Sequence, residues 1–275
     1  MSKFSEVTST ASDVSFTTAQ EHLKGKRTLV LGNGKLTLRA VHFKGVKCPG
    51  FPPAPKGVPV KYWMKRLNLF SKFDEGIHMD DFAWFETTPE AVAKHIALSI
   101  KKLSVSTVLD GCCGVGSACI QLALQMRKVV ILANDLSEDR VEMSRHNAKV
   151  YNVFNRIKFQ TGDFCEFGHS KRLRFSSTAV FLSPPWGGPS CNDLDTFSIF
   201  ETEPLIADMM RHALRSVGRH LVVFLPKHTR LEDILKISTE LGCSTPPLIE
   251  TVVYALPKPH CKGILVYMSQ DEFTV

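Results

Sequence analysis

Short apolar runs alternate with helix-like stretches along the second half of this chain, and this alternation constrains the fold more than any other feature. The runs are three to six residues long and have the composition of strands buried on both faces. Helical stretches over residues 116–126, 137–151, 199–215 and 230–241 separate them. The predicted strands are Thr107–Leu109, Val129–Leu132, Ile157–Gln160, Ala179–Leu182, Leu221–Leu225, Thr251–Leu256 and Gly263–Met268. The pattern predicts an α/β fold with a mostly parallel, seven-stranded sheet that is covered on both faces and closed by a terminal hairpin.

Composition divides the chain into three parts. Residues 1–20 are rich in Ser and Thr and are predicted to be a disordered tail. Residues 21–105 form a basic N-terminal extension, and residues 106–275 form the α/β domain. Positive charge is concentrated in the extension, because residues 21–72 hold twelve Lys and Arg side chains and a single acid, whereas the whole chain carries +7. Such a block attracts phosphate chains, although a solvated basic surface without a partner is the alternative.

Local patterns predict several elements in the extension. Alternation of apolar and polar residues over Thr28–Phe43 indicates a hairpin that turns at Asn33-Gly34. Val60–Phe73 is predicted to be a basic helix that bears aromatic residues. Another helix is expected to begin at Thr88-Pro89, with Thr88 as its cap and Pro89 in its first turn.

The cysteines and the apolar content exclude some classes of protein. The eight cysteines include no C-x-x-C pair and no Cys/His cluster with zinc spacing, so we expect free thiols and no structural metal. No apolar run reaches the ~18 residues that a membrane-spanning helix needs. We therefore expect a soluble, intracellular protein that does not bind membranes.

A glycine-rich loop follows the first strand of the α/β domain. The strand ends at Asp110, and the loop contains Gly114 and Gly116 before a helix begins. Glycines here let the backbone approach a ligand at the carboxyl edge of the sheet. The third glycine of a dinucleotide fingerprint is missing, and an acid at position 110 disfavours a pyrophosphate but suits a cationic cofactor. The loop therefore favours S-adenosylmethionine over a nicotinamide dinucleotide.

Acidic residues also end the next two predicted strands. Asp135 is placed to accept hydrogen bonds from both ribose hydroxyls of a nucleoside. Asp163 could accept from an adenine amino group, and Phe164 could lie against the adenine ring. An Asp at a strand end is often only a turn former or a helix cap. Three of them behind a glycine loop predict a methyl-donor site.

The fourth predicted strand runs into Ser183-Pro184-Pro185-Trp186-Gly187-Gly188-Pro189. The prolines fix the backbone, so that the Ser183 hydroxyl and the Pro184 carbonyl can both point outward as acceptors. Acceptors for the two protons of an exocyclic amine would aim its nitrogen lone pair at the methyl group, so that catalysis is mainly positioning. Trp186 offers a flat face for a base, and a cationic 7-methylguanine ring would gain a cation–π term of roughly 1–2 kcal/mol there.

The heptapeptide from Ser183 to Pro189 resembles the catalytic loop of the trimethylguanosine synthase family, which methylates N2 of the 7-methylguanosine cap of small nuclear and nucleolar RNAs. The likeness spans about residues 58–270 in the same order. It includes Lys61-Tyr62-Trp63, Leu69 to Asp74, Trp84-Phe85 before Thr88-Pro89-Glu90, Asp110 to Gly116, and Phe224 to Lys227. The resemblance implies a Rossmann-like class I methyltransferase with an N-terminal helical extension.

The resemblance also implies a role for each matching residue. Trp186 would stack on the methylated guanine, with Ser183 against its other side, and Lys61 and Lys227 would hold the cap phosphates. The donor would be bound by one group of residues, made up of Phe70, Thr88, Asp110, Gly114, Gly116, Asp135, Asp163 and Phe164. Ser183, Pro184 and Trp186 would be the catalytic residues, with no metal.

Two departures from the family pattern stand out. Ser117 and Ala118 replace the usual glycine and asparagine, and Lys227 replaces an arginine, which weakens bidentate phosphate contact. Three other functions remain open from the residues alone, namely N6-adenine methylation, methylation of a protein glutamine amide, and an inactive RNA-binding relative. His228 as a general base is a further idea. The implied partner is capped RNA, the implied state a monomer, and the implied location the nucleus (nucleolus or nucleoplasm), with the cytoplasm as a second location.

Overall fold

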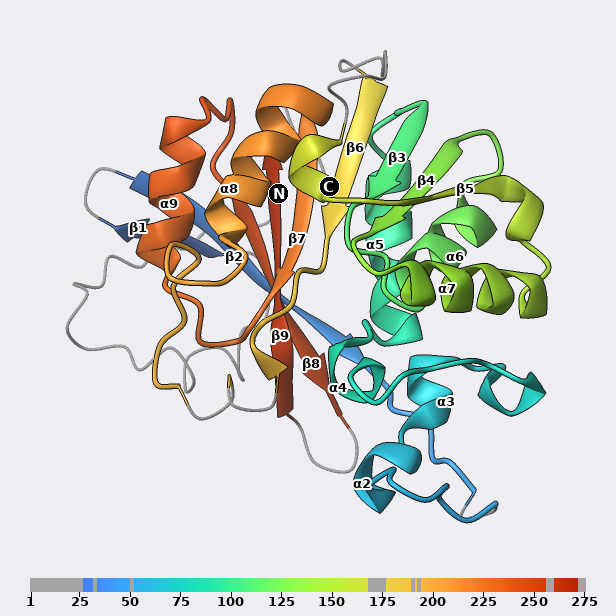
Figure 1. Ribbon diagram of the computed structural model, residues 1–275. Helices are drawn as coiled ribbons and strands as arrows, with labels where there is room; N and C mark the ends of the chain where they lie inside the picture. The colour runs from blue at the N-terminus through green and yellow to red at the C-terminus, as the bar shows by residue number, and fades with distance from the viewer. Residues whose placement is uncertain are drawn as a thin grey trace, which may run out of the picture.

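A single twisted sheet forms the centre of the molecule (Figure 1). The fold is known from a computed structural model, which describes residues 27–31, 34–49, 52–167, 177–188, 191, 194–255 and 260–271. Nine strands of the described chain pair in the order β1-β2-β8-β9-β7-β6-β3-β4-β5. The strands are β1 (Arg27–Leu31), β2 (Gly34–Phe43), β3 (Thr107–Asp110), β4 (Val130–Asp135), β5 (Ile157–Thr161), β6 (Thr178–Leu182), β7 (His220–Leu225), β8 (Leu248–Tyr254) and β9 (His260–Ser269).

The strand order contains a switch point between β3 and β6. From β3 the chain moves outward through β4 to β5, and it then returns to β6 on the other side of β3, with all of these pairs parallel. Asp110 lies opposite Phe181, so the loops after β3 and β6 leave the sheet side by side. A crevice at the carboxyl ends of the strands is the expected ligand site of such a sheet. The predicted strand alternation and the terminal hairpin of β8 and β9 are confirmed.

The strand count is the main correction to the predicted fold. Seven strands were expected, but the N-terminal hairpin extends the sheet because β2 pairs in parallel with β8 along seven residues. This pairing covers an edge of β8 that would otherwise be open. Leu31 pairs with Gly34, so Gly34 is the first residue of β2 instead of part of a turn. Residues 32 and 33, the predicted tail and Pro189 lie outside the described residues.

A buried carboxylate links the added strand to the rest of the sheet. Glu250 on β8 is fully buried and pairs with Arg39 on β2. It also contacts His95 Nε2 and accepts a hydrogen bond from the Tyr267 hydroxyl, each at 2.6 Å. Burial acts to raise the pKa of Glu250, but these partners hold the pKa below its ordinary value. A charge that is buried with this many partners stays ionised and fixes the register of β2.

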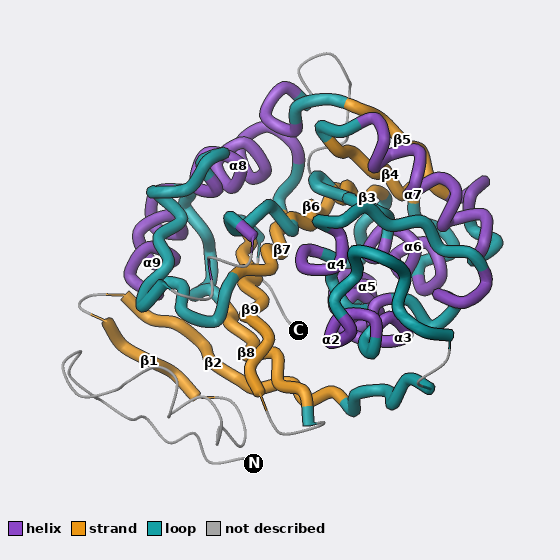
Figure 2. The backbone as a smooth tube through the Cα atoms, turned by 60° about the horizontal axis from the view of Figure 1, so that its bottom comes forward, coloured by secondary structure: helices purple, strands orange, loops and turns teal. Residues whose placement is uncertain are grey.

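Helices cover both faces of the sheet, as Figure 2 shows. One core contains α5, α6 and the aromatic residues of the extension, and the other contains α8 and α9. Neighbouring residues of one strand divide between the two cores, as Val108 and Leu109 do. The helices are α2 (Val60–Trp63), α3 (Arg66–Leu69), α4 (Ala83–Glu86), α5 (Glu90–Lys101), α6 (Ser117–Gln125), α7 (Glu138–Val150), α8 (Ile206–His212), followed by a π-helical turn, and α9 (Leu231–Glu240). No helix within the described ranges is both long and apolar enough to cross a bilayer.

Two predicted helices differ from the observed ones. The helix expected over Val60–Phe73 is broken into α2 and α3, and the break lets fully buried Arg66 pair with Asp74 (Nε–Oδ1 2.7 Å). The helix expected from residue 199 begins only at Ile206. A residue that precedes a proline is disfavoured in the α conformation, which opposes a helix running into Pro204. Just before this stretch, the Ser198 hydroxyl donates a hydrogen bond to Asp233 of α9.

The extension is delivered to the catalytic edge of the sheet by β2. Because β2 is parallel to β8, and both β8 and β7 are antiparallel to β9, the carboxyl end of β2 lies at the same edge as those of β3, β6 and β7. The chain after β2 then forms α2 to α4, which gather beside that edge in Figure 1. The N-terminal segment therefore takes part in the site that the sheet creates.

Candidate active site

A cavity of about 430 Å³ lies at the switch point, which is within the range of small-molecule sites. The loops after β3, β4, β5 and β6 form its floor, and the end of α4 with the residues that follow forms its roof. Of the predicted donor-binding residues, Thr88, Gly114, Asp135, Asp163 and Phe164 line it. Ser183 and Pro185 of the catalytic loop also line it. Two of the three strand-end acids, Asp135 and Asp163, therefore lie at one cavity.

The glycine loop is shaped by backbone conformation and by Asp135. Gly114 and Gly116 have φ of +51° and +99°, values that other residues rarely adopt. A Cβ on Gly116 would lie 2.5 Å from the Ser144 hydroxyl. Asp135 accepts hydrogen bonds from the N–H groups of Gly114 at 2.8 Å and Ser137 at 3.0 Å. Each carboxylate oxygen keeps a lone pair that a ribose hydroxyl could use.

Asp110 is fully buried behind the glycine loop and is not among the residues that line the cavity. Burial, reinforced by the nearby charge of Asp135, raises the pKa of Asp110 to about 8. The backbone N–H groups of Cys112 and Cys119 act in the opposite direction, but neither carboxylate oxygen has a partner at hydrogen-bonding geometry among the described residues. A buried acid without a partner is costly unless a positive charge comes near it. This arrangement fits a cationic methyl donor in the adjacent cavity.

The adenine end of the site is formed after β5. The Asp163 carboxylate accepts a hydrogen bond from the Cys165 N–H at 2.8 Å, so it also caps the short turn that begins there. The Phe164 ring lies against Gly111, where a Cβ would come within 2.6 Å of it. Glycine at position 111 is therefore required for the ring to form one wall of the cavity.

Two predicted roles, the capping role of Thr88 from its local sequence and the donor-binding role of Phe70 from the resemblance, differ from the structure. Thr88 does not cap α5, since its hydroxyl lies 3.2 Å from the Ser183 hydroxyl and its carbonyl accepts from the Ser117 hydroxyl at 2.5 Å. Ser117 thus ties the glycine loop to the roof of the donor cavity. Phe70 lines neither cavity described here, because its ring is buried in the core beside Tyr151. The structure therefore does not bring Phe70 to the donor site.

A larger cavity of about 920 Å³ lies on the other side of the catalytic loop. Pro184 and Trp186 line it, whereas Ser183 and Pro185 line the donor cavity. The loop is therefore the partition between the two spaces. The Trp186 indole donates to the Phe224 carbonyl at 3.1 Å and packs edge-on against the Phe224 ring, which fixes its orientation.

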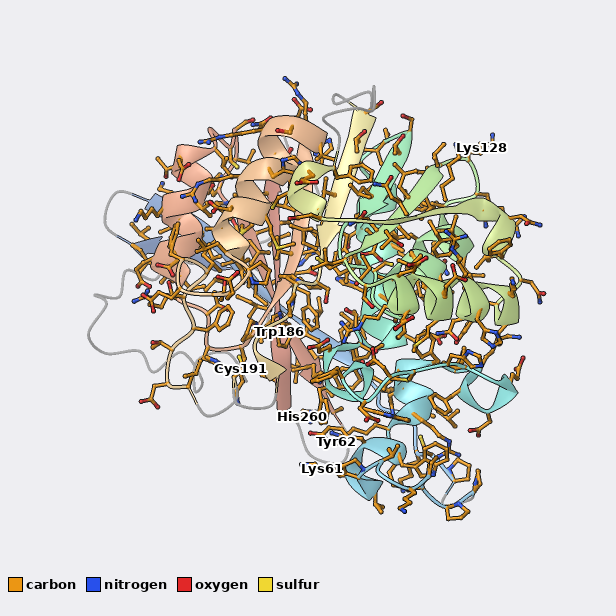
Figure 3. The ribbon with its side chains drawn as sticks, in the orientation of Figure 1. Lys61, Tyr62, Lys128, Trp186, Cys191 and His260 are labelled. Atoms are coloured by element: carbon orange, nitrogen blue, oxygen red, sulfur yellow. The ribbon has the colours of Figure 1, made fainter. Side chains whose placement is uncertain are left out.

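The larger cavity is rich in basic side chains. Figure 3 shows Lys61, Tyr62 and His260 around the same end of the molecule as Trp186, although they come from distant parts of the chain. Lys61 lies over the Tyr62 ring at 4.9 Å, so it is held near the cavity. The basic residues that line the cavity are Lys47, Lys61, Lys65, Lys227, His228, His260 and Lys262. A cavity of this charge suits a ligand with several phosphates.

His228, the candidate general base, lies beside Cys191. It lines the larger cavity but not the donor cavity, and it lies 3.7 Å from the Cys191 sulfur. Burial, together with the charge of Lys227, lowers the pKa of His228. A neutral imidazole beside Lys227 is suited to a hydrogen bond with a phosphate or sugar.

Several cavity residues had no signal in the sequence that we recognised. Lys47 comes from a connector, Lys65 from the turn between α2 and α3, and His260 and Lys262 from the β8–β9 hairpin, and only the fold brings them together. The excess of basic residues over 21–72 was a partial signal for the first two. Glu86 was missed entirely, although it lines both cavities.

Known proteins resemble the chain in both sequence and fold. Residues 105–271 match the family model described as RNA cap guanine-N2 methyltransferase. The trimethylguanosine synthase of Schizosaccharomyces pombe is 33% identical over 193 residues, which cover 68% of this chain and 78% of that protein. The trimethylguanosine synthase of Saccharomyces cerevisiae is 28% identical over 239 residues, or 84% and 74% of the two chains. A solved structure described as a methyltransferase, from Porphyromonas gingivalis W83, superposes with a TM-score of 0.56 at 16% identity, over 81% of this chain and 54% of that one, and this likeness concerns the fold alone.

Proposed function

Because this chain belongs to the RNA cap guanine-N2 methyltransferase family, we propose that it adds two methyl groups in turn to the 7-methylguanosine cap, using the residues of the catalytic loop. The reaction class itself, transfer of a methyl group from S-adenosylmethionine to N2 of the cap guanine, is that of the family. The proposal thus concerns the number of transfers, the roles of individual residues and the RNAs that are modified. Because the acceptor of this family is the cap guanine, adenine and a protein glutamine are no longer considered as acceptors.

One observation carries the proposal. The catalytic loop separates a donor cavity from a basic cavity, and its successive residues Ser183, Pro184, Pro185 and Trp186 line the two sides in alternation. A methylated guanine stacked on Trp186 would have its amino edge directed at this partition. The basic side chains around it, among them Lys61 and Lys227, would hold the phosphates of the cap.

The chain's own groups would act by orienting the amine. The bound donor supplies an electrophilic methyl group on a sulfonium. The Ser183 hydroxyl and the Pro184 carbonyl would accept hydrogen bonds from the two amine protons, which aims the nitrogen lone pair across the partition. Ser183 could pass its own hydrogen bond to Thr88, whose hydroxyl lies 3.2 Å away. Stacking on Trp186 would exclude water and hold the ring plane.

The same geometry would permit a second transfer. In the first transfer the N–C bond forms as the sulfonium C–S bond breaks, neutral S-adenosylhomocysteine leaves, and the acidic proton of the methylated amine passes to water. The amine then keeps one N–H, so a single acceptor suffices to orient it. The larger cavity, at about 920 Å³, leaves space for a methylated amine to be presented again. We therefore expect 2,2,7-trimethylguanosine as the end product and 2,7-dimethylguanosine as its intermediate.

Methyl transfer to a minimal cap tests the function. Labelled S-adenosylmethionine would be incubated with 7-methyl-GTP and, as a control, with GTP, and the products would be separated by mass. We expect singly and then doubly labelled 7-methyl-GTP and no labelled GTP. Trp186→Ala should reduce the efficiency roughly 5- to 30-fold through loss of the cation–π term, while Trp186→Phe should retain part of it. Donor binding that is unchanged in Trp186→Ala would separate stacking from folding. Transfer to neither nucleotide by the wild-type protein would contradict a minimal-cap substrate.

The cellular substrates and location are a separate part of the proposal. We propose small nuclear and nucleolar RNAs as substrates and the nucleus as the main location, since the relatives are named for the trimethylguanosine that such caps carry. We also propose that the protein acts as a monomer, because each cavity is completed by residues of one chain. Microscopy of a tagged protein, with recovery of trimethylguanosine-capped RNA from depleted cells, tests the first point. An exclusively cytoplasmic protein would contradict it.

A further inference from the structure

We propose that Glu86 is the residue that reads the Watson–Crick edge of the acceptor base, and that it makes the enzyme specific for guanine. The inference rests on the proposed function, because it assumes a base stacked beside Trp186. Glu86 ends α4, and among the described residues it is the one that lines both the donor cavity and the larger, basic cavity. The transferred methyl group must pass from one cavity to the other. A side chain at their boundary is therefore close to the amine that receives it.

The Glu86 carboxylate is fixed at one oxygen and open at the other. Its Oε2 lies 3.0 Å from Arg140 Nη1, and no other polar contact of the carboxylate occurs in the part of the chain that the structure describes. Arg140 also binds Asp80, whose second oxygen accepts from the Ala83 N–H at 2.6 Å at the start of α4. Arg140 thus holds two carboxylates at once, and of these only Glu86 lines both cavities. The side chain keeps 26% exposure, so Oε1 remains available to a ligand.

The chemistry of the available oxygen matches guanine. Guanine presents two adjacent groups of donors on this edge, the N1–H and the N2 amine, and methylation at N7 gives the ring a positive charge. A carboxylate accepts strongly from such donors, and it is attracted to the cationic ring. Adenine carries an acceptor at N1, which would face the carboxylate with like polarity. A site built to satisfy a base edge rejects the analogue that leaves its groups unpaired.

The acceptors at the partition would divide the base edge between them. The Ser183 hydroxyl and the Pro184 carbonyl would accept hydrogen bonds from the amine, whereas Glu86 would accept one from the N1–H. Among the described residues that line the basic cavity, Glu86 is the one carboxylate. Without Glu86, recognition would depend on the two acceptors for the amine and on stacking, which tolerates any base, and the N1–H would not be read.

A pair of cap analogues tests the inference by binding alone. 7-Methyl-GTP offers the N1–H, and 1,7-dimethyl-GTP has a methyl group in its place. We expect the wild-type protein to prefer the first about tenfold or more, and Glu86→Ala to reduce that preference to about threefold or less by weakening 7-methyl-GTP binding. Glu86→Gln keeps the shape of the side chain and should fall between the two. Binding of S-adenosylhomocysteine would report that each variant retains a folded donor site.

Asp80→Asn is the matched control, since it removes the other carboxylate that holds Arg140 but leaves Glu86 in place. We expect its preference between the two analogues to stay close to that of the wild type. The inference is overturned if Glu86→Ala keeps the full preference, or if Asp80→Asn loses as much of it as Glu86→Ala. A wild-type protein that binds neither analogue would instead refute the proposed function, and this inference would fall with it. Wild-type transfer to 7-methyl-GTP together with unchanged binding by Glu86→Ala would refute the role of Glu86 alone.

Discussion

Replacing Asp110 by Asn should remove a proton that is released when the donor binds. In the free protein, burial raises the pKa of Asp110 to about 8, so at pH 7 its side chain is mainly the neutral acid. A cationic donor in the adjacent cavity favours the carboxylate, and the proton must then leave. Asparagine has almost the same shape and cannot ionise, so it separates this electrostatic role from packing.

The magnitude follows from the position of the group. A positive charge held roughly 5 Å away at an effective dielectric constant of about 20 favours the carboxylate by about 3 kcal/mol. Since one pH unit corresponds to about 1.4 kcal/mol, donor binding should lower the pKa of Asp110 by about two, to near 6. At pH 7 about nine-tenths of the free protein and about one-tenth of the bound protein would then carry the proton. The wild type should release roughly 0.8 proton per donor bound at this pH.

Calorimetric titration with S-adenosylmethionine in two buffers of different ionisation enthalpy measures this number directly. We expect the affinity of the wild type to rise between pH 6 and 7.5 and that of Asp110→Asn to stay flat. Equal proton release by both proteins would refute the reasoning, as would none from the wild type. The raised pKa also predicts that, without donor, the contribution of Asp110 to stability is complete below pH 3.8 and is lost as the pH rises toward 8. Asp110→Asn should therefore unfold at a higher temperature than the wild type at pH 8.

Three other substitutions have defined outcomes. Gly116→Ala should lower the free energy of unfolding, measured in urea, by roughly 2–4 kcal/mol. The reason is that the position has φ +99° and a Cβ there would meet Ser144. A loss below about 0.5 kcal/mol would contradict this. Ser117→Ala should lower thermal stability by roughly 1–2 kcal/mol and weaken donor binding, since it leaves the buried Thr88 carbonyl without its 2.5 Å donor, and an unchanged melting temperature would argue against that role. Glu250→Gln should cost roughly 3 kcal/mol at neutral pH, and the difference should shrink as the pH falls through the lowered pKa of Glu250; a difference that does not depend on pH would exclude the ion-pair explanation.

The parts of the fold with a local signal were predictable from sequence. Strands β6 and β7 are buried along their whole length, and burial on both faces leaves a continuous apolar run in the sequence. The pairing of β2 with β8 joins residues about 200 positions apart, and nothing near Thr28–Phe43 indicates it. The break between α2 and α3 was missed for a different reason, because the ion pair of Arg66 with Asp74 outweighs helix propensity.

The candidate site divides in a similar way. Asp135, Asp163, Ser183 and Trp186 could be assigned because strand ends and the double proline place their side chains at one edge of the sheet. The resemblance implied that Phe70 binds the donor, but its ring is buried in the core. The basic and acidic residues that only tertiary structure gathers around the larger cavity had no sequence pattern of their own.

The position of the larger cavity in the chain has a consequence for how the enzyme is made. Residues that line the donor cavity fall between positions 83 and 209, whereas the larger cavity needs residues from position 45 to position 262. During synthesis, every residue that lines the donor cavity therefore leaves the ribosome before the last two strands, whereas the larger cavity stays incomplete until those strands emerge. Completing it requires long-range pairing, which is slow to form.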